Sequence, residues 1–253
     1  MLYISNCMNI FYHFGRYILF LRSLFRRPEK FSMYWREMLR QMNDIGVTSI
    51  PIVGVVATFI GAVTAIQFAY QIQDFLIPIY YVGFIVRDSM IIEMAPTISC
   101  MILAGKVGSN MASELGNMRI TEQIDALEIM GVNTASYLIG TKIIASLIMI
   151  PLLIIIAAFL GIMGGMIATV TSDISTLGEY ERGLHAFFIP FNVSMMLIKG
   201  VTFAYILSTV SCYQGYFVKG GAIQIGEAST RAVVYSNILI LIFDYVIAFM
   251  LLQ

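Results

Sequence analysis

The sequence predicts an all-α integral membrane protein, and three observations support this fold class. Of its 253 residues, 59% are hydrophobic and 12% are charged, whereas soluble domains carry roughly 25% charged residues. No charged residue occurs between Asp44 and Asp74 or between Lys142 and Asp173, and about 20 apolar residues are enough for a helix to cross a bilayer. The apolar segments also lack the alternation of apolar and polar residues, over about ten positions, that a transmembrane barrel requires.

Residues 1–40 are predicted to be an amphipathic N-terminal segment, in which a helix over about residues 8–27 lies in the membrane interface. On a helical wheel, basic and polar residues fall on roughly one half, and aromatic and aliphatic residues fall on the other. The short apolar run Tyr17–Leu21 lies between arginines, and no small-residue cleavage site follows it, which argues against a signal peptide. A further transmembrane helix is the alternative, which Arg22, Arg26 and Arg27 disfavour.

Five transmembrane helices are predicted in residues 41–253, which form one membrane domain. Their approximate ranges are 47–70, 85–107, 141–171, 189–212 and 231–252. The N-terminal segment and the loops on its side of the membrane carry twelve Lys and Arg residues, whereas the opposite loops carry only Arg87 and Arg182. Because loops rich in Lys and Arg stay in the cytoplasm, we expect a cytoplasmic N-terminus and a C-terminus on the other side.

A charged, amphipathic stretch, Glu114–Gly131, separates the second and third predicted spans. Ile120, Ile124 and Leu127 recur at helical spacing, and acidic residues recur every three positions on another side. This pattern is typical of a short helix with one face against its own protein and one face open. We expect a cytoplasmic coupling helix that contacts a partner protein; a solvated loop helix is the alternative.

Three ionisable residues fall inside predicted spans, where charges are costly and a functional role is the default expectation. Glu93 lies in the second span just before Pro96, Lys199 lies in the fourth and Asp244 in the fifth. Lys199 and Asp244 are expected to form an intramembrane polar pair that joins two helices. Glu93 is then left without a partner, so we expect it to line a cavity.

The sequence contains no pattern that indicates an enzyme or a metal site. The three cysteines have neither disulfide nor metal-binding spacing, and the two histidines, His13 and His185, are far apart. HExxH and GxSxG motifs are absent, and Gly105-Lys106 lacks the rest of a nucleotide-binding loop. We therefore expect no catalytic residue, no metal and no cofactor bound by this chain.

Two long motifs occur in an order that is found in a known family. The first comprises Glu93-Met-Ala-Pro96, Ala104-Gly-Lys-Val-Gly108 and Glu114–Gly131; the second is Gly220–Val234, followed by Asp244-Tyr245. Both resemble the signatures of MlaE-type permeases, the MlaE/YrbE family, which are membrane subunits of lipid-transport ABC transporters. The resemblance extends from about residue 35 to the end of the chain.

The resemblance implies a permease in the bacterial inner membrane, with a periplasmic C-terminus, that moves phospholipids between the inner and outer membranes. It implies a homodimer, a cytoplasmic ABC ATPase docked between spans two and three, and a periplasmic MCE-domain protein, without any nucleic acid. ATP is then used by the partner subunit, and this chain is not an enzyme. A stand-alone secondary transporter or channel with an intramembrane ion path is the alternative, although five spans do not divide into two repeats.

Site residues follow from these motifs. A lipid head group needs polar contacts, for which Glu93, Tyr70 and Tyr81 are the candidates. The expected ATPase-coupling residues are Glu114, Leu115, Gly116, Met118, Arg119, Glu122, Gln123 and Asp125. The second signature contributes Gly226, Thr230 and Arg231. Ile92 stands where the family usually has Arg, so this chain lacks a cation that the resemblance places beside Glu93.

Overall fold

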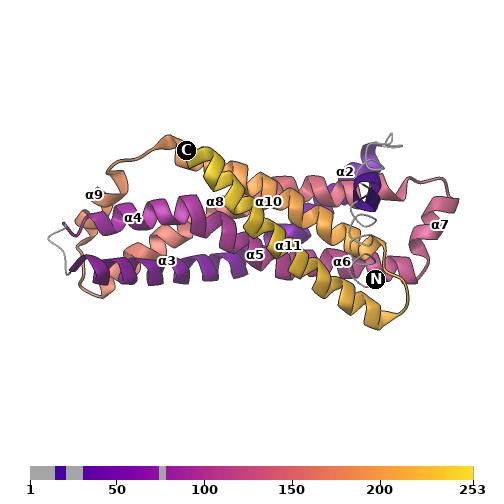
Figure 1. Cartoon of the computed structure of the whole chain (residues 1–253), viewed down its shortest axis with the longest axis horizontal. Coiled ribbons are helices and arrows are strands. Elements are labelled where there is room, and N and C mark those ends of the chain that lie inside the picture. The colour runs from indigo at the N-terminus through magenta and orange to yellow at the C-terminus, as the bar shows by residue number, and fades with distance from the viewer. Residues whose placement is uncertain (1–14, 21–30, 74–77, 253) are drawn as a thin grey trace, which may run out of the picture.

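The computed structural model describes residues 15–20, 31–73 and 78–252, and these residues form helices and turns without strands. The helices run along one elongated bundle, with α9 (Leu177–His185) at one end and α7 (Gln123–Ile129) at the other (Figure 1). We call these the α9 end and the α7 end. The predicted all-α class is confirmed.

Within the described residues, five helical stretches are long and apolar enough to cross a membrane, as predicted. They are Met33–Ile72, Tyr81–Ile120, Ala135–Thr171, Pro190–Tyr216 and Ala222–Leu251. The first two contain 40 residues each, about 60 Å of helix at 1.5 Å per residue. The hydrocarbon core is only about 30 Å thick, so both must extend well beyond it.

The first two stretches consist of several helical segments. The first contains α2 (Phe31–Ile45), the 3₁₀ turn η1 (Val47–Ser49) and α3 (Ile50–Gln73). The second contains α4 (Tyr81–Ser89), η2 (Met90–Ile98), α5 (Ser99–Leu103), η3 (Ala104–Gly108) and α6 (Ser109–Ile120). The third joins η4 (Ala135–Gly140) to α8 (Thr141–Thr171), and the last two are α10 (Pro190–Tyr216) and α11 (Ala222–Leu252).

The second span is interrupted by two π-helical segments, η2 and η3. Pro96 lies within η2 and has no backbone N–H to donate to the helical ladder. Short π-helical segments occur frequently at functional sites because they displace side chains from regular helical positions. Here η2 carries Glu93 and η3 carries Lys106.

Glycines bring α3 and α8 into backbone contact. A Cβ atom on Gly61 would lie 1.8 Å from the carbonyl oxygen of Gly161, and one on Gly164 would lie 2.2 Å from the carbonyl oxygen of Thr58. Only glycine permits this approach, which is the way small residues pack transmembrane helices. The α3–α8 pair lies alongside α4 toward the α9 end of the bundle (Figure 1).

Part of the predicted N-terminal segment is visible. Residues 15–20 are helical, Tyr17 Oη donates a hydrogen bond to Thr209 Oγ1 at 2.7 Å, and Phe20 is buried. Arg16 lies over the ring of Phe217, with its guanidinium carbon 3.8 Å from the ring centroid. This helix therefore packs on the end of α10. Residues 1–14 and 21–30 lie outside the described part, so an interfacial helix over about residues 8–27 stays a prediction.

Candidate functional site

Lys199 is the centre of a charge cluster inside the bundle. Its side chain is fully buried, and its Nζ lies 2.6 Å from Glu93 Oε2 and 2.6 Å from Asp244 Oδ1. Thr97 Oγ1 donates a hydrogen bond of 3.1 Å to Asp244 Oδ2. Glu93 and Thr97 lie on η2, Lys199 on α10 and Asp244 on α11, so the cluster ties three segments together. We call these four residues the buried charge cluster.

The structure contains the expected contact between Lys199 and Asp244. Glu93 was expected to have no partner, but it also forms an ion pair with Lys199. A lysine ammonium has three N–H donors, so one Lys can bind two carboxylates. With all three groups ionised, the cluster carries a net charge of −1. The Glu93 side chain is 45% exposed, against 9% for Asp244, so Glu93 is the carboxylate that faces the surface of the bundle.

Tyr70 and Tyr81 lie toward the α9 end and do not join this cluster. Tyr70, near the end of α3, is 73% exposed. Tyr81 begins α4 and stacks on Tyr80 and Phe187, with centroid distances of 4.6 and 6.4 Å. Twelve residues separate Tyr81 from Glu93 along the second span, about 18 Å of helical rise. The three candidates for a lipid pathway are therefore spread along the bundle.

The segment Glu114–Gly131 is not one helix, contrary to the prediction. α6 continues the second span to Ile120, the chain turns at Thr121 and Glu122, and α7 begins at Gln123. Glu122 has φ 58°, in the left-handed region that residues other than glycine rarely adopt. Hydrophobic spacing missed this break because apolar residues recur at helical intervals on both sides of it.

Polar contacts hold α7 against the rest of the chain. Arg119 and Asp125 form an ion pair of 2.7 Å across the break. Glu128 Oε1 accepts hydrogen bonds from Thr134 Oγ1 at 2.9 Å and from Tyr216 Oη at 3.2 Å. α7 is thereby bonded to α6, to the start of the third span and to the end of α10.

Two of the expected coupling residues, Leu115 and Gly116, are buried. Glu114 is partly exposed, and its Oε2 lies 2.5 Å from Nζ of the buried Lys142, which also donates to Gln41 Oε1 at 3.0 Å. Of the others, Glu122 and Gln123 are exposed, and Met118, Arg119 and Asp125 are partly exposed.

Exposed apolar residues occur at the end of α7 and at the start of α11, and the sequence prediction missed them. Ile129 is 88% exposed and Met130 is 69% exposed, whereas Ile223, at the start of α11, is 77% exposed. All three lie at the α7 end (Figure 1). The sequence did contain a signal for these residues, because Ile129 and Met130 directly follow Glu128 and lie outside every predicted span. We call Ile129, Met130 and Ile223 the apolar tip.

The second signature lies on the outer face of α11. Gly226, Thr230 and Arg231 are exposed, and Thr230 Oγ1 donates to the carbonyl oxygen of Gly226 at 3.0 Å. Arg231 forms an ion pair of 3.0 Å with Glu227 one helical turn earlier. Within the described residues, no group of three or more His, Cys, Asp or Glu side chains is arranged to hold a metal ion.

A bundle with five membrane-crossing stretches, charges in its interior and a bonded polar segment at one end has the architecture of a membrane transport subunit. The family model described as Permease MlaE matches residues 38–250, and the chain belongs to this family. It is therefore a multi-pass membrane protein and an ABC-transporter permease. Family membership favours this function over the alternative of a stand-alone transporter or channel.

Similar proteins come from bacteria and from a plant. The chain is 35% identical over 227 residues to a probable ABC transporter permease protein of Rickettsia bellii, covering 90% of this chain and 86% of that protein. It is 32% identical over 225 residues to one of Synechocystis, covering 86% and 82%. It is 29% identical over 219 residues to the Arabidopsis thaliana protein TRIGALACTOSYLDIACYLGLYCEROL 1, chloroplastic, covering 87% and 62%.

Proposed function

We propose that this permease moves phospholipids between the inner and outer membranes of a bacterium. The observation that carries the proposal is the buried charge cluster, which offers a half-exposed carboxylate, Glu93, within an apolar bundle. Such a site suits an amphipathic substrate, because acyl chains need apolar walls and a head group needs polar contacts. The name of the Arabidopsis relative, which is that of a glycerolipid, supports the same substrate class.

The lipid pathway includes Glu93 and leads toward the α9 end. Ile92 and Met94, which flank Glu93, are partly exposed and supply apolar contacts beside the carboxylate. Tyr70 and Tyr81 lie along the same bundle nearer the α9 end, where a head group leaving the cluster meets hydroxyl groups. Because Ile92 has no positive charge, the part of the pathway near η2 carries no net positive charge.

A cytoplasmic ABC ATPase docks at the α7 end and hydrolyses ATP for the transporter. The contact surface consists of Glu122, Gln123 and the apolar tip, all of which are exposed. The ion pair of Glu114 with Lys142 connects α6 to α8 just inside this surface. ATP-driven movement of α7 then reaches the second and third spans through bonded contacts.

The functional unit is a homodimer in the inner membrane, with the α9 end in the periplasm. On α11, large apolar residues at helical spacing are exposed, namely Ile238, Leu241, Ile242, Tyr245 and Phe249. A second copy covers part of this face and closes the pathway beside Glu93. Phe187, Phe188 and Ile189 are exposed at the α9 end and offer contacts to a periplasmic MCE-domain protein.

A photo-crosslinking experiment during transport tests the proposed pathway. A benzophenone amino acid at position 93 is expected to capture phospholipid, and the captured amount is expected to fall while the assembled transporter hydrolyses ATP. The matched control is position 205 on α10, where Tyr205 is 41% exposed; capture of bulk lipid there is expected to be independent of ATP.

The Glu93→Ala variant completes this test. Lys199 keeps Asp244 as its partner in this variant, so expression is expected to be normal while lipid transport is impaired. Normal transport by Glu93→Ala, together with ATP-independent capture at position 93, would contradict the proposed pathway.

A further inference from the structure

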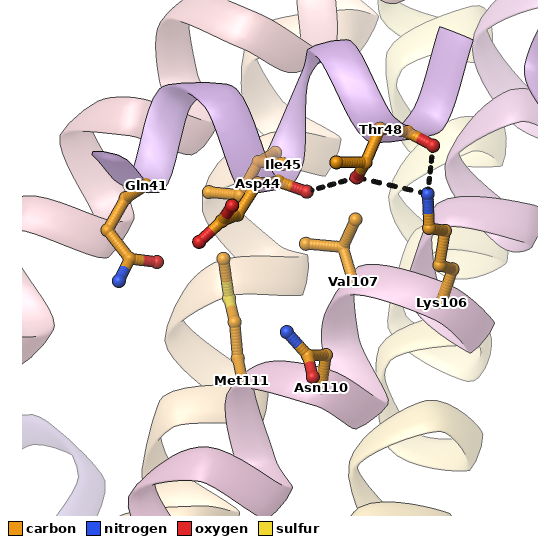
Figure 2. A pocket seen from close by; sticks show the side chains of 8 residues that line it. All are labelled: Gln41, Asp44, Ile45, Thr48, Lys106, Val107, Asn110 and Met111. Atoms are coloured by element: carbon orange, nitrogen blue, oxygen red, sulfur yellow. Dashed lines mark hydrogen bonds between the residues drawn. The ribbon is translucent and has the colours of Figure 1, made fainter. Parts of the chain in front are cut away.

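A second polar site lies in a cavity of about 310 Å³ between the buried charge cluster and the α7 end. Its Lys106 is thirteen residues beyond Glu93 in the second span, about 19 Å of helical rise. It is formed where α2 and η1 meet η3 and α6 (Figure 2). Asp44, Lys106 and Asn110 line it with polar groups. Its volume is at the lower end of the roughly 300–1,000 Å³ that is typical of small-molecule pockets, which suits a head group and not a whole lipid.

The two charged side chains that line this cavity, Asp44 and Lys106, do not form an ion pair with each other. Asp44 is exposed, and its carboxylate has no hydrogen bond or ion pair with any described residue. Lys106 Nζ donates to the carbonyl oxygen and to Oγ1 of Thr48, the latter at 3.1 Å. Figure 2 shows the carboxylate of Asp44 well separated from the ammonium of Lys106. The cavity therefore presents a free anion and a partly satisfied cation to one ligand.

Apolar side chains complete the lining of the cavity. Ile45, Val107 and Met111 are each less than 5% exposed and line it together with the polar groups. Beside it, Val47 is 54% exposed and Ile50 is 38% exposed, at the start of the apolar helix α3. A ligand that places a charged head in the cavity thus finds apolar surface continuing toward the membrane interior.

Helix lengths put the cavity at the membrane surface. The 24 residues of α3 rise about 36 Å, more than the hydrocarbon thickness of about 30 Å, so the preceding residues Asp44–Thr48 lie outside the hydrocarbon. Lys106 lies 19 residues beyond Arg87, a loop charge of the opposite side, which is about 28 Å of helical rise and close to the hydrocarbon thickness. The two charged residues therefore emerge from the membrane together, at head-group depth.

We propose that this cavity binds the head group of a zwitterionic aminophospholipid from the leaflet at the α7 end. Asp44 accepts hydrogen bonds from the lipid ammonium, and Lys106 donates to the phosphate. Charge-assisted hydrogen bonds of this kind are about twice as strong as neutral ones. An anionic head group without an ammonium leaves Asp44 unpaired beside its own negative charge, so the site discriminates by head-group charge.

Photo-crosslinking in nanodiscs of defined lipid tests the proposal on the full chain without ATP, and so independently of transport. A benzophenone amino acid replaces Asn110 on the cavity rim, and the matched control replaces the exposed Asn117, two turns further along α6. In phosphatidylethanolamine nanodiscs, lipid adducts are expected at position 110 and only weakly at 117. In phosphatidylglycerol nanodiscs, the adduct at position 110 is expected to be several-fold weaker.

Two variants then identify the groups that bind. Asp44→Asn is expected to lower the phosphatidylethanolamine adduct about tenfold, as loss of one hydrogen bond to a charged group. Glu181→Gln removes an exposed carboxylate at the α9 end and is expected to change nothing. Equal adducts in the two lipids, no effect of Asp44→Asn in a variant with unchanged melting temperature, or adducts with protein alone would each overturn the proposal.

Discussion

At the scale of single residues, Lys199 explains how a membrane-spanning bundle tolerates three ionisable groups. A charge at the centre of a bilayer costs about 2.5–3.5 kcal/mol on insertion scales, and the cost falls when opposite charges meet. Lys199 lies between Glu93 and Asp244, so removing either carboxylate still leaves the ammonium paired. Removing Lys199 instead leaves two carboxylates facing each other without a cation.

This asymmetry predicts different effects for two substitutions at the buried charge cluster. Lys199→Met is expected to lower the free energy of unfolding by about 3–5 kcal/mol, as when one partner of a buried pair is lost. Glu93→Gln keeps the shape of the half-exposed side chain and is expected to have a small effect. Thermal unfolding of the purified variants in detergent measures both, and equal melting temperatures would show that Lys199 does not hold the cluster together.

At the scale of elements, α7 is a short helix whose position depends on bonds to its neighbours. Seven residues are too few for a helix that is stable alone in water. Arg119, Thr134 and Tyr216 contact its acidic side chains, while Ile129 and Met130 remain exposed. The docking surface that we propose for the ATPase thus depends on contacts of α7 with three other segments.

A charge placed in the apolar tip is expected to release the ATPase. Ile129→Asp introduces an unpaired carboxylate into a contact that burial makes favourable, so the ATPase is expected to be lost from the purified complex. The matched control is Leu177→Asp, because Leu177 is 54% exposed at the α9 end, and this variant is expected to keep the ATPase. Reversing the charges of Glu122 and Asp125 together is also expected to release it. Retention of the ATPase by all these variants would place the coupling surface elsewhere.

α9 gives a pH-dependent prediction at the same scale. Glu179 Oε2 accepts hydrogen bonds from the backbone N–H and the hydroxyl of Thr176, both at 2.9 Å, in a capping box. These bonds lower the pKa of Glu179 below its usual value. Since the folded pKa is the lower one, the stabilisation is present above the unfolded pKa, about 4.3, and is lost as pH falls through the folded pKa.

Hydrogen-exchange protection of α9 measures this cap. After correction for intrinsic exchange rates, protection is expected to decrease between pH 6 and pH 3.5 in the unmodified chain. Glu179→Gln is expected to show lower protection at pH 6 and little further change on acidification. A decrease of equal size in both proteins would assign the pH dependence to another group.

At the scale of the whole molecule, the bundle is longer than a membrane is thick, and its two ends differ in character. The half of the bundle toward α7 carries bonded polar residues and the cavity lined by Asp44 and Lys106. The α9 end carries exposed aromatic residues, and Arg87 there donates to the carbonyl oxygens of Leu184 and Ala186 at 2.6 and 2.9 Å. The two ends of the bundle therefore present surfaces of different chemistry.

Single-cysteine labelling is expected to place the two ends on opposite sides. With Cys7 replaced by Ser, cysteines at Arg16 and Gln123 are expected to react only from the cytoplasm, and one at Gly178 only from the periplasm. Cys100 and Cys212 are buried and serve as an unreactive background. Labelling of positions 16 and 123 from different sides would require another crossing between them and overturn the topology.

The sequence by itself determined the class, the five spans and the resemblance to a permease family, because hydropathy and motifs are properties of contiguous residues. The tertiary structure determined which charged side chains form ion pairs. Glu93 pairs with Lys199 and Glu114 with Lys142, across 106 and 28 positions of the chain. The helical spacing of apolar residues continues through the break at Glu122. A single residue in the left-handed region changes the direction of the chain without changing that spacing, so the sequence pattern does not indicate the break. Partners and directions depend on packing between distant helices, which no local pattern contains.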